Sequence, residues 1–194
     1  LVDRLRPRVA IAENVKGMIL GNAKGYTKLV MARFKEIGYR VQLFLLNAAD
    51  CGVPQRRERV FFVAVRDDLP GGKLELSPQH RWISAGEACE DLQELTAAEK
   101  IDTKQSRRDV LWWHKTKPGD SYAAAIKKAE NRLSCFNTIR LNGNEPANSL
   151  PGVCDQIQHW SQPRRPSFRE WKRLGSFPDD YHAKTDKIGK YMIG

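Results

Sequence analysis

The sequence predicts an α/β fold in which a mostly parallel sheet is covered by helices. Two apolar runs of strand length lie at 8–12 and 41–46, and the segment between them has the apolar spacing of one helix face. A strand, a helix and a strand joined by short links form a βαβ unit, in which the two strands run parallel. A third apolar run, at 60–65, predicts a further strand.

Each of these elements has its own signal. The first strand is short and apolar, and we expect it to be buried and to end at Glu13. The helix is predicted from residue 26 to 37, and Gly38 follows where a helix often ends. The run at 60–65 is continuously apolar, which is typical of a strand buried on both faces. The helix face is formed by Tyr26, Leu29, Val30, Phe34 and Ile37.

The regular pattern ends after Arg66. Pro70-Gly71-Gly72 predicts a turn or linker, and Ser84 with Glu87 predicts a capping box that opens a short acidic helix. No period dominates from 104 to 152. Near the end of the chain, Ser167 to Gly175 predicts one or two helical turns, stopped by Pro178.

The charge is unevenly distributed along the 194 residues. Lys and Arg exceed Asp and Glu by 33 − 23 = +10, which favours a polyanionic partner. Residues 83–99 carry five acids and no Lys or Arg, and residues 100–140 carry ten basic and four acidic side chains. We therefore expect a solvated acidic helix beside a cationic face.

The cysteines indicate neither a metal site nor a disulfide framework. Cys51, Cys89, Cys135 and Cys154 lie far apart, without a C-x-x-C pair, and the four His are scattered. We expect free thiols in a reducing cytoplasm and no bound metal. No stretch approaches the ~20 apolar residues of a membrane span, and no secretion signal is visible.

Two groups of residues have the potential for chemistry. Glu13-Asn14-Val15 follows the first strand, at the sheet edge where ligands bind in open α/β sheets. A carboxyl group there could donate or accept a proton, although a Glu that caps the next turn is an equally good reading of its position alone.

The second group is Gln55 to Arg59, before the third strand. In an extended chain Arg57 and Arg59 point to one face, and Arg56 points to the other. Two adjacent guanidinium groups repel unless a phosphate, a base carbonyl or a carboxylate such as Glu13 lies between them. The alternative is a solvated strand entrance.

Together with a downstream tract, these groups resemble the DNA (cytosine-5) methyltransferases. The family pattern is matched by Glu13-Asn14-Val15, by the tract Asn47 to Val60 with its Pro54-Gln55-x-Arg57-x-Arg59, and by Arg165 to Leu174 followed by Phe177-Pro178-Asp179-Asp180-Tyr181. The resemblance implies the second half of a Rossmann-like methyltransferase mixed sheet, with a small irregular target-recognition domain. The implied domains are 1–69 (catalytic), 70–160 (target recognition) and 161–194 (return to the catalytic domain).

The resemblance also implies roles. Glu13 would hold a flipped cytosine and protonate or hydrogen-bond its N3 while a Cys attacks carbon 6. Arg59 would contact the base and place Glu13, and Arg57 would support the site. Asn14, Val15 and Gln55 would position the substrate. The methyl donor would be S-adenosylmethionine, and the partner would be double-stranded DNA.

The basic residues of the predicted recognition region and return segment are candidates for contact with DNA. They are Arg107, Arg108, Lys115, Lys117, Arg140, Arg165 and Arg169. Trp112 and Trp113 could stack on bases. For each of the two tryptophans taken singly, we expect core packing.

Several parts of the family pattern do not occur in the sequence. None of the four cysteines follows a Pro, and there is no Phe-x-Gly-x-Gly cofactor loop. Cys51 stands where the family usually has an aromatic residue, so we expect it to pack. Tyr191 to Gly194 resembles the beginning of the last family motif. We therefore expect a fragment that is inactive alone, with no assignable cofactor residues, and completed by a missing N-terminal half or separate subunit. The alternative is an inactive or split module that binds DNA or a partner without catalysis.

Overall fold

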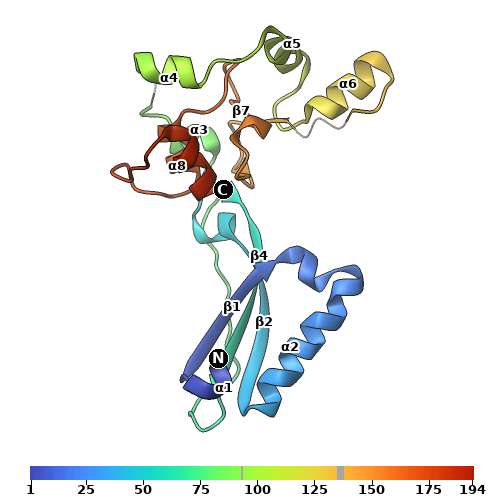
Figure 1. The fold of residues 1–194 in the computed structure, drawn as a ribbon, viewed down its shortest axis with the longest axis vertical. Helices are drawn as coiled ribbons and strands as arrows, with labels where there is room; N and C mark the ends of the chain where they lie inside the picture. Colours follow the sequence, from blue (N-terminus) through green and yellow to red (C-terminus); the bar gives the residue numbers. More distant parts are fainter. Residues whose placement is uncertain (93, 135–137) are drawn as a thin grey trace.

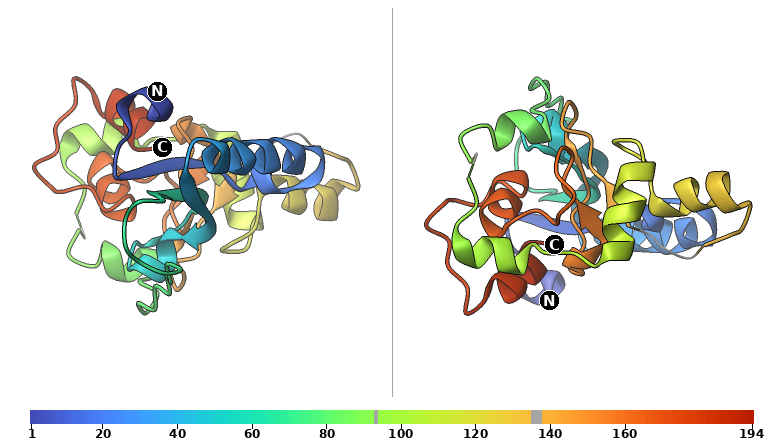
Figure 2. Two further views of the ribbon diagram at one scale, coloured as in Figure 1. Left: turned by 90° about the horizontal axis from the view of Figure 1, so that it is seen from below. Right: turned by 90° about the horizontal axis from the view of Figure 1, so that it is seen from above.

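The computed structural model describes residues 1–92, 94–134 and 138–194. Figure 1 shows two parts. We call the part formed by β1 (Val9–Val15), α2 (Lys24–Glu36), β2 (Tyr39–Asn47) and β4 (Glu58–Arg66) the sheet lobe. The helical lobe is the part formed by α3 (Ala85–Ala88), α4 (Ala97–Asp102), α5 (Arg107–Lys115), α6 (Tyr122–Glu130), α7 (Phe168–Leu174) and α8 (Asp186–Ile193). In both views of Figure 2, α2 and α6 project to one side of the molecule, whereas α7 and α8 lie on the other.

The sheet lobe contains three strands in the order β1-β4-β2. Helix α2 (Lys24–Glu36) connects β1 (Val9–Val15) to β2 (Tyr39–Asn47), as the βαβ pattern predicts. However, β4 (Glu58–Arg66) lies between these two strands and is antiparallel to both, so the expectation of a mostly parallel sheet is wrong. The connection from β2 to β4 is too short for a crossover, and the chain therefore reverses direction.

Burial in the sheet is one-sided. Val60, Phe62 and Ala64 of β4 are buried in the core that α2 covers, but their neighbours on the opposite face are only half-buried. The prediction of burial on both faces is therefore wrong. The expected burial of β1 is wrong too, because Ile11 is 67% exposed. Strand β1 lies at the edge of this sheet, with β4 as its one neighbour among the described residues.

Helix α2 meets the sheet with part of its predicted face. Val30, Phe34 and Ile37 pack on the core, whereas Tyr26 and Leu29 are exposed. Gly38 follows the helix with φ 78°, which confirms its predicted role as a C-terminal glycine.

The connection between the lobes is made by short elements. After β2, the 3-10 turn η3 (Ala48–Cys51) leads to β3 (Gln55–Arg56), which pairs in parallel with β6 (Ala147–Asn148). Strand β5 (Ile139–Arg140) pairs in parallel with β7 (Ile157–Gln158). The remaining short elements are α1 (Val2–Leu5), η1 (Lys16–Ile19), η2 (Gly21–Ala23) and η4 (Cys154–Gln156).

The helices of the helical lobe are short. The predicted turns at 167–175 are confirmed as α7, but α5, α6 and α8 were not predicted. Helices α5 and α6 have nine residues each, and the side chains of Ser106 and Ser121 cap their first turns. The helices are α3 (Ala85–Ala88), α4 (Ala97–Asp102), α5 (Arg107–Lys115), α6 (Tyr122–Glu130), α7 (Phe168–Leu174) and α8 (Asp186–Ile193).

Two apolar clusters stabilise the helical lobe. Trp171 and Leu174 of α7 pack with Leu141 and Ile157, so the segment after 161 shares a core with the segment before it. Trp112 and Trp113 are buried with Tyr122 and Ile126 between α5 and α6, which confirms a core role for both tryptophans. The domain boundaries at 69 and 160 stay a prediction.

The acidic segment forms two short helices instead of one solvated helix. Glu87 accepts a bond from Arg81 with its carboxylate, so Ser84 caps α3 without a complete capping box. Glu99 is 7% exposed and binds Arg169, and Asp91 binds Arg173. The expectation of a solvated acidic helix is therefore wrong for Glu99, which Arg169 of α7 holds in the protein, whereas Asp91 stays 56% exposed in its pair with Arg173.

The cysteine and metal predictions have mixed outcomes. Cys89 is buried and free, whereas Cys51 is free and exposed in the η3 turn, so its predicted packing role is wrong. Cys135 and the side chain of Cys154 lie outside the described residues. In the described part of the chain, no group of His, Cys, Asp and Glu side chains could hold a metal ion, and no helix has both the length and the apolar character to cross a membrane.

Candidate active site

Glu13 and Arg59 form an ion pair across the sheet. In the β1–β4 register, Val15 lies opposite Arg59 and Glu13 lies opposite Phe61. Glu13 and Arg59 are therefore diagonal neighbours on one face. Arg59 Nε lies 2.8 Å from Glu13 Oε1, and Arg59 also donates to the carbonyl of Glu58. The Arg59 side chain is 22% exposed and that of Glu13 is 49% exposed. The carboxylate is thus held by one guanidinium and remains open to a ligand.

Arg57 connects this site to the end of α8. Its Nη1 donates to the carbonyl of Gly194 at 3.2 Å. Burial and the nearby charge of Arg59 lower the pKa of Arg57, and the charge of Glu13 raises it. Arg57 is therefore close enough to interact electrostatically with both members of the ion pair. The predicted supporting role of Arg57 is compatible with this position.

The three residues predicted to position the substrate, Asn14, Val15 and Gln55, do not lie together. The Oδ1 of Asn14 accepts the backbone N–H of Val15 at 2.8 Å. Val15 lines a pocket of about 520 Å³. Gln55 is buried and donates to the carbonyl of Leu174, so it connects β3 to α7. The pocket is also lined by Lys16, Gly17, Asn47, Arg56, Glu58, Arg59 and Ser149.

Arg56 points toward the helical lobe. Its Nη2 lies 2.8 Å from Glu145 Oε2, and its guanidinium lies over the ring of Trp82 at 5.1 Å. Trp82 Nε1 in turn donates to Asp50 at 2.8 Å. The partners of Arg56 thus differ from Glu13. This agrees with the prediction that Arg56 points to the face opposite that of Arg57 and Arg59.

The seven candidate DNA contacts fall into two groups. The first group consists of exposed side chains on α5 or directly after it: Arg107, Arg108, Lys115 and Lys117. Lys115 Nζ lies 5.0 Å from the centre of the Trp112 ring. Figure 1 shows α5 and α6 at the end of the molecule away from the sheet lobe. A role in DNA contact for these four residues stays a prediction.

The second group has intramolecular partners. Arg140 donates to the carbonyls of Trp113, Thr116 and Trp160. Arg165 pairs with Asp155, and Arg169 pairs with Glu99 at 2.8 Å. The Arg169 side chain and the hydrogen bonds of Thr96 hold the pKa of Glu99 at about 2. A role in DNA contact for these three arginines stays a prediction.

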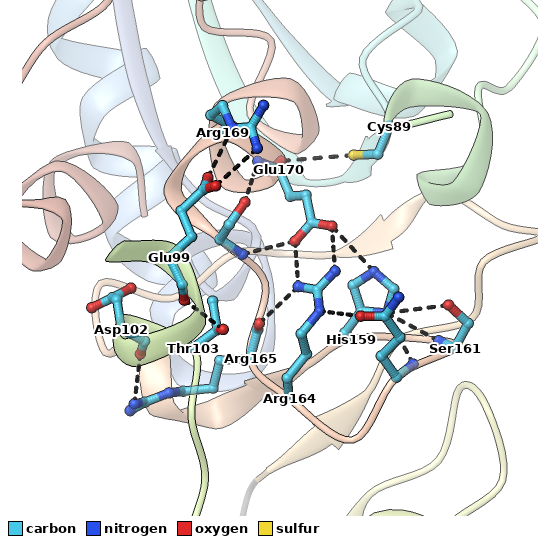
Figure 3. Close-up of polar contacts among 12 residues, drawn as sticks. Cys89, Glu99, Asp102, Thr103, His159, Ser161, Arg164, Arg165, Arg169 and Glu170 are labelled. Carbon is cyan, nitrogen blue, oxygen red and sulfur yellow. Dashed lines mark hydrogen bonds and ion pairs between the residues drawn. The ribbon is translucent and has the colours of Figure 1, made fainter. Parts of the chain in front are cut away.

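A buried polar network in the helical lobe was not predicted (Figure 3). Arg164 donates to both carboxylate oxygens of Glu170 at 2.7 Å, and His159 Nε2 lies 3.2 Å from Oε1. Ser161 and Gln162 donate backbone N–H groups to His159 Nδ1, which places the imidazole proton on Nε2. Ser167 completes a capping box with Glu170. In the sequence, the spacing of Ser167 and Glu170 was an available signal for this network.

The pocket beside Arg59 does not fit S-adenosylmethionine, because none of its lining side chains is aromatic and could stack on the adenine ring. The pocket beside Arg59 is lined by Lys16, Arg56 and Arg59, and Glu58 is paired with Lys16 at 2.8 Å. Each of the three cations has a carboxylate partner at 2.8 Å: Lys16 has Glu58, Arg56 has Glu145 and Arg59 has Glu13. These carboxylates are therefore already engaged and do not offer a free anionic partner to a sulfonium cation.

Comparison with known proteins decides the family. The model of the C-5 cytosine-specific DNA methylase family matches residues 1–193. The chain belongs to this family. Methylases of this family use S-adenosylmethionine as methyl donor, and their structures have a Rossmann-like methyltransferase fold.

Two bacterial methylases illustrate the sequence similarity. The type II methyltransferase M.NgoFVII of Neisseria gonorrhoeae is 31% identical over 93% of this chain and 52% of its own length. The type II methyltransferase M.FnuDI of Fusobacterium nucleatum is 48% identical over 100% of this chain and 62% of its own length. The chain spans about half the length of the curated relatives it matches.

Solved structures support the same fold. The Dnmt2 methyltransferase of S. pombe aligns with a TM-score of 0.59 at 14% identity, over 97% of this chain and 61% of that one. A prophage-encoded E. coli protein described as a DNA modification methyltransferase aligns with a TM-score of 0.67 at 18% identity, over 100% of this chain and 70% of that one. The α/β class and the mixed sheet predicted from sequence are thereby confirmed.

Proposed function

We propose that this chain is the base-holding and target-recognition part of a DNA (cytosine-5) methyltransferase of a restriction–modification system. The observation that carries the proposal is the ion pair between Arg59 Nε and Glu13 Oε1 at 2.8 Å. It joins the two residues to which the family resemblance assigns the cytosine, at the end of β1 where a ligand can reach the carboxylate.

The chemistry of cytosine explains why such a pair is useful. A protonated Glu13 donates to N3 of the ring, and this withdraws electrons from carbon 6. Carbon 6 then becomes open to attack by a nucleophile. Arg59 holds the carboxyl group in place and can donate to an acceptor on the base. Because ring atoms inside a duplex cannot be attacked, the cytosine is flipped out of the helix before it meets this pair.

The nucleophile and the methyl donor site would come from another segment or subunit. No cysteine of this sequence follows a Pro, and the pocket beside Arg59 does not fit S-adenosylmethionine. The edge strand β1 offers exposed Val9, Ile11 and Val15 to such a segment. These side chains lie on the same face of β1 as Glu13, so a partner that covers this apolar face would also complete the site around Glu13. We place the complete enzyme in the cytoplasm, where the free thiol of Cys89 stays reduced.

The isolated 194-residue chain is expected not to methylate DNA. It has the residues that hold cytosine, but it has neither the Pro-Cys nucleophile nor the cofactor loop. The measurement is transfer of a tritiated methyl group from S-adenosylmethionine to duplex DNA by the purified chain. The matched sample contains the complete enzyme. Transfer that rises in proportion to the concentration of the isolated chain would contradict the prediction.

Replacing Lys115 and Lys117 together by Ala is expected to flatten the salt dependence of DNA binding. Each phosphate contact releases counterions, and each contributes about 0.9 to the slope of log K against log salt. The slope should therefore fall by about 2, without a change in sequence preference. A double substitution of the exposed Lys184 and Lys187 removes the same charge from another part of the chain. Equal slope changes in the two variants would show that net charge alone is responsible.

The exposed apolar edge of β1 also favours a second candidate function, a module that binds DNA or a partner without catalysis. The two functions differ in what the complete protein does. Methyl transfer to cytosine by the complete protein supports the enzyme. Tight DNA binding without transfer supports the module.

A further inference from the structure

Asn47, the last residue of β2, lies at the point where the chain turns toward the candidate site. Its Oδ1 accepts two backbone N–H groups. One is that of Ala49 at 3.2 Å, which caps the η3 turn, and the other is that of Arg57 at 3.1 Å. A single side-chain atom thus connects the beginning of the turn to a residue ten positions later.

Residues 47 and 48, which we call the Asn47 corner, fix the backbone of Arg57 on both sides. Its N–H binds Asn47 Oδ1, and its carbonyl accepts the N–H of Ala48 at 3.0 Å. The next residue, Glu58, is paired with Asn47 in the β2–β4 register. The direction in which β4 leaves the corner is therefore set at Asn47, and Arg59 projects from the second residue of β4.

The geometry points to Asn47 as a positioning residue for the site formed by Glu13, Arg57 and Arg59. Its side-chain oxygen holds the backbone from which both arginines project, and so it determines where Arg59 meets Glu13. This inference rests on the proposed function, because it assigns Asn47 to the same site.

The amide nitrogen of Asn47 could bind substrate, and the experiment must distinguish this role from the positioning role. Both bonds use the oxygen, so the NH₂ group is directed away from them, and Asn47 also lines the pocket of about 520 Å³. If the NH₂ group bound substrate, Asn47 would act by contact. Substitution by Asp distinguishes the two roles, because a carboxylate accepts the same two N–H groups but donates none.

The test uses the complete enzyme with N47A, N47D and the control N142A. Asn142 is matched in residue type, and its Oδ1 also accepts a backbone N–H, that of Asn144 at 3.1 Å. N47A is expected to lower kcat by about 10²-fold, because small displacements of catalytic groups have effects of this size. DNA affinity and KM should change little. N47D should recover most of kcat, and N142A should keep kcat unchanged.

Three results would overturn the proposal. The first is N47A with normal kcat, and the second is N47D as impaired as N47A. The third is a loss in either variant that appears in DNA affinity and KM instead of kcat, which would indicate a substrate contact. If N47A does not fold, N47D decides alone: near-normal kcat supports the positioning role, and a loss of kcat contradicts it.

Hydrogen exchange separates this proposal from the proposed function. In the same complete enzyme, the peptide amides around Arg57 should exchange faster in N47A and regain protection in N47D. If the wild-type protein transfers no methyl group, the proposed function fails, and the exchange result still decides whether Asn47 holds the Arg57 backbone. Unchanged exchange in N47A would contradict the positioning role whatever the activity.

Discussion

In the complete enzyme, Glu13→Gln is expected to lower the rate of methyl transfer by about 10²–10⁴-fold while DNA affinity stays within a small factor of normal. Gln keeps the size of the side chain and one hydrogen bond, but it cannot supply a proton to N3 of cytosine. The ion pair of Arg59 Nε with Glu13 Oε1 at 2.8 Å is the contact on which this expectation depends. The measurement is single-turnover methyl transfer with saturating DNA and cofactor.

Two further variants make this prediction specific. Arg59→Ala should also lower the rate, and combined with Glu13→Gln the two losses should be less than additive, because Arg59 acts by holding Glu13. Arg56→Ala is the control from the neighbouring position. It breaks the partly exposed pair with Glu145 and the contact with the Trp82 ring, each of which contributes at most about 1 kcal/mol to stability. Near-normal turnover in Glu13→Gln together with loss of activity in Arg56→Ala would show that the pocket is wrongly assigned.

Glu170→Gln is expected to destabilise the folded chain by about 3–5 kcal/mol, which is the usual effect of removing one partner from a buried ion pair. Glu170 is 2% exposed and Arg164 is 9% exposed, and their two contacts are both 2.7 Å. Gln leaves the guanidinium of Arg164 without its counter-charge and weakens the bond from His159. Urea unfolding measures the difference in the free energy of unfolding.

The same network should make the free energy of unfolding of the wild-type chain depend on pH. Although burial opposes ionisation, bonds from Arg164 and His159 lower the pKa of Glu170 from 4.5 to about 2. A lowered carboxyl pKa contributes stability above pH 4.5 that is lost as pH falls toward 2, about 3 kcal/mol in total. Burial also lowers the pKa of His159, so its contribution declines as pH falls below 6.5. Glu170→Gln should flatten the loss between pH 4.5 and 2.

Glu130→Gln is the matched control for the stability measurement. Glu130 pairs with Arg132 at 2.6 Å, but the two side chains are 41% and 57% exposed. Such a surface pair contributes at most about 1 kcal/mol. If Glu170→Gln and Glu130→Gln had equal, small effects, the buried network would not be important for the stability of the helical lobe.

Sequence reasoning was most successful where a pattern is local. The apolar runs predicted β1, β2 and β4 at nearly their observed places, and the spacing of α2 was long enough to be recognised. The alternation of Arg57 and Arg59 suggested Glu13 as a counter-charge, and the structure brings Glu13 to Arg59. Helices α5 and α6 were missed; each has nine residues, against thirteen in α2.

By itself, the sequence determined which segments can be strands and helices, and which charged residues precede the third strand, because these properties depend on neighbouring residues. The tertiary structure decided which strand lies in the middle of the sheet and which carboxylates meet which guanidinium groups. The antiparallel insertion of β4, the exposure of β1 and the pairing of Arg169 with Glu99 all depend on contacts between residues far apart in the chain. The same is true of the Asn47 corner, where a bond across ten residues orients the strand that carries Arg59.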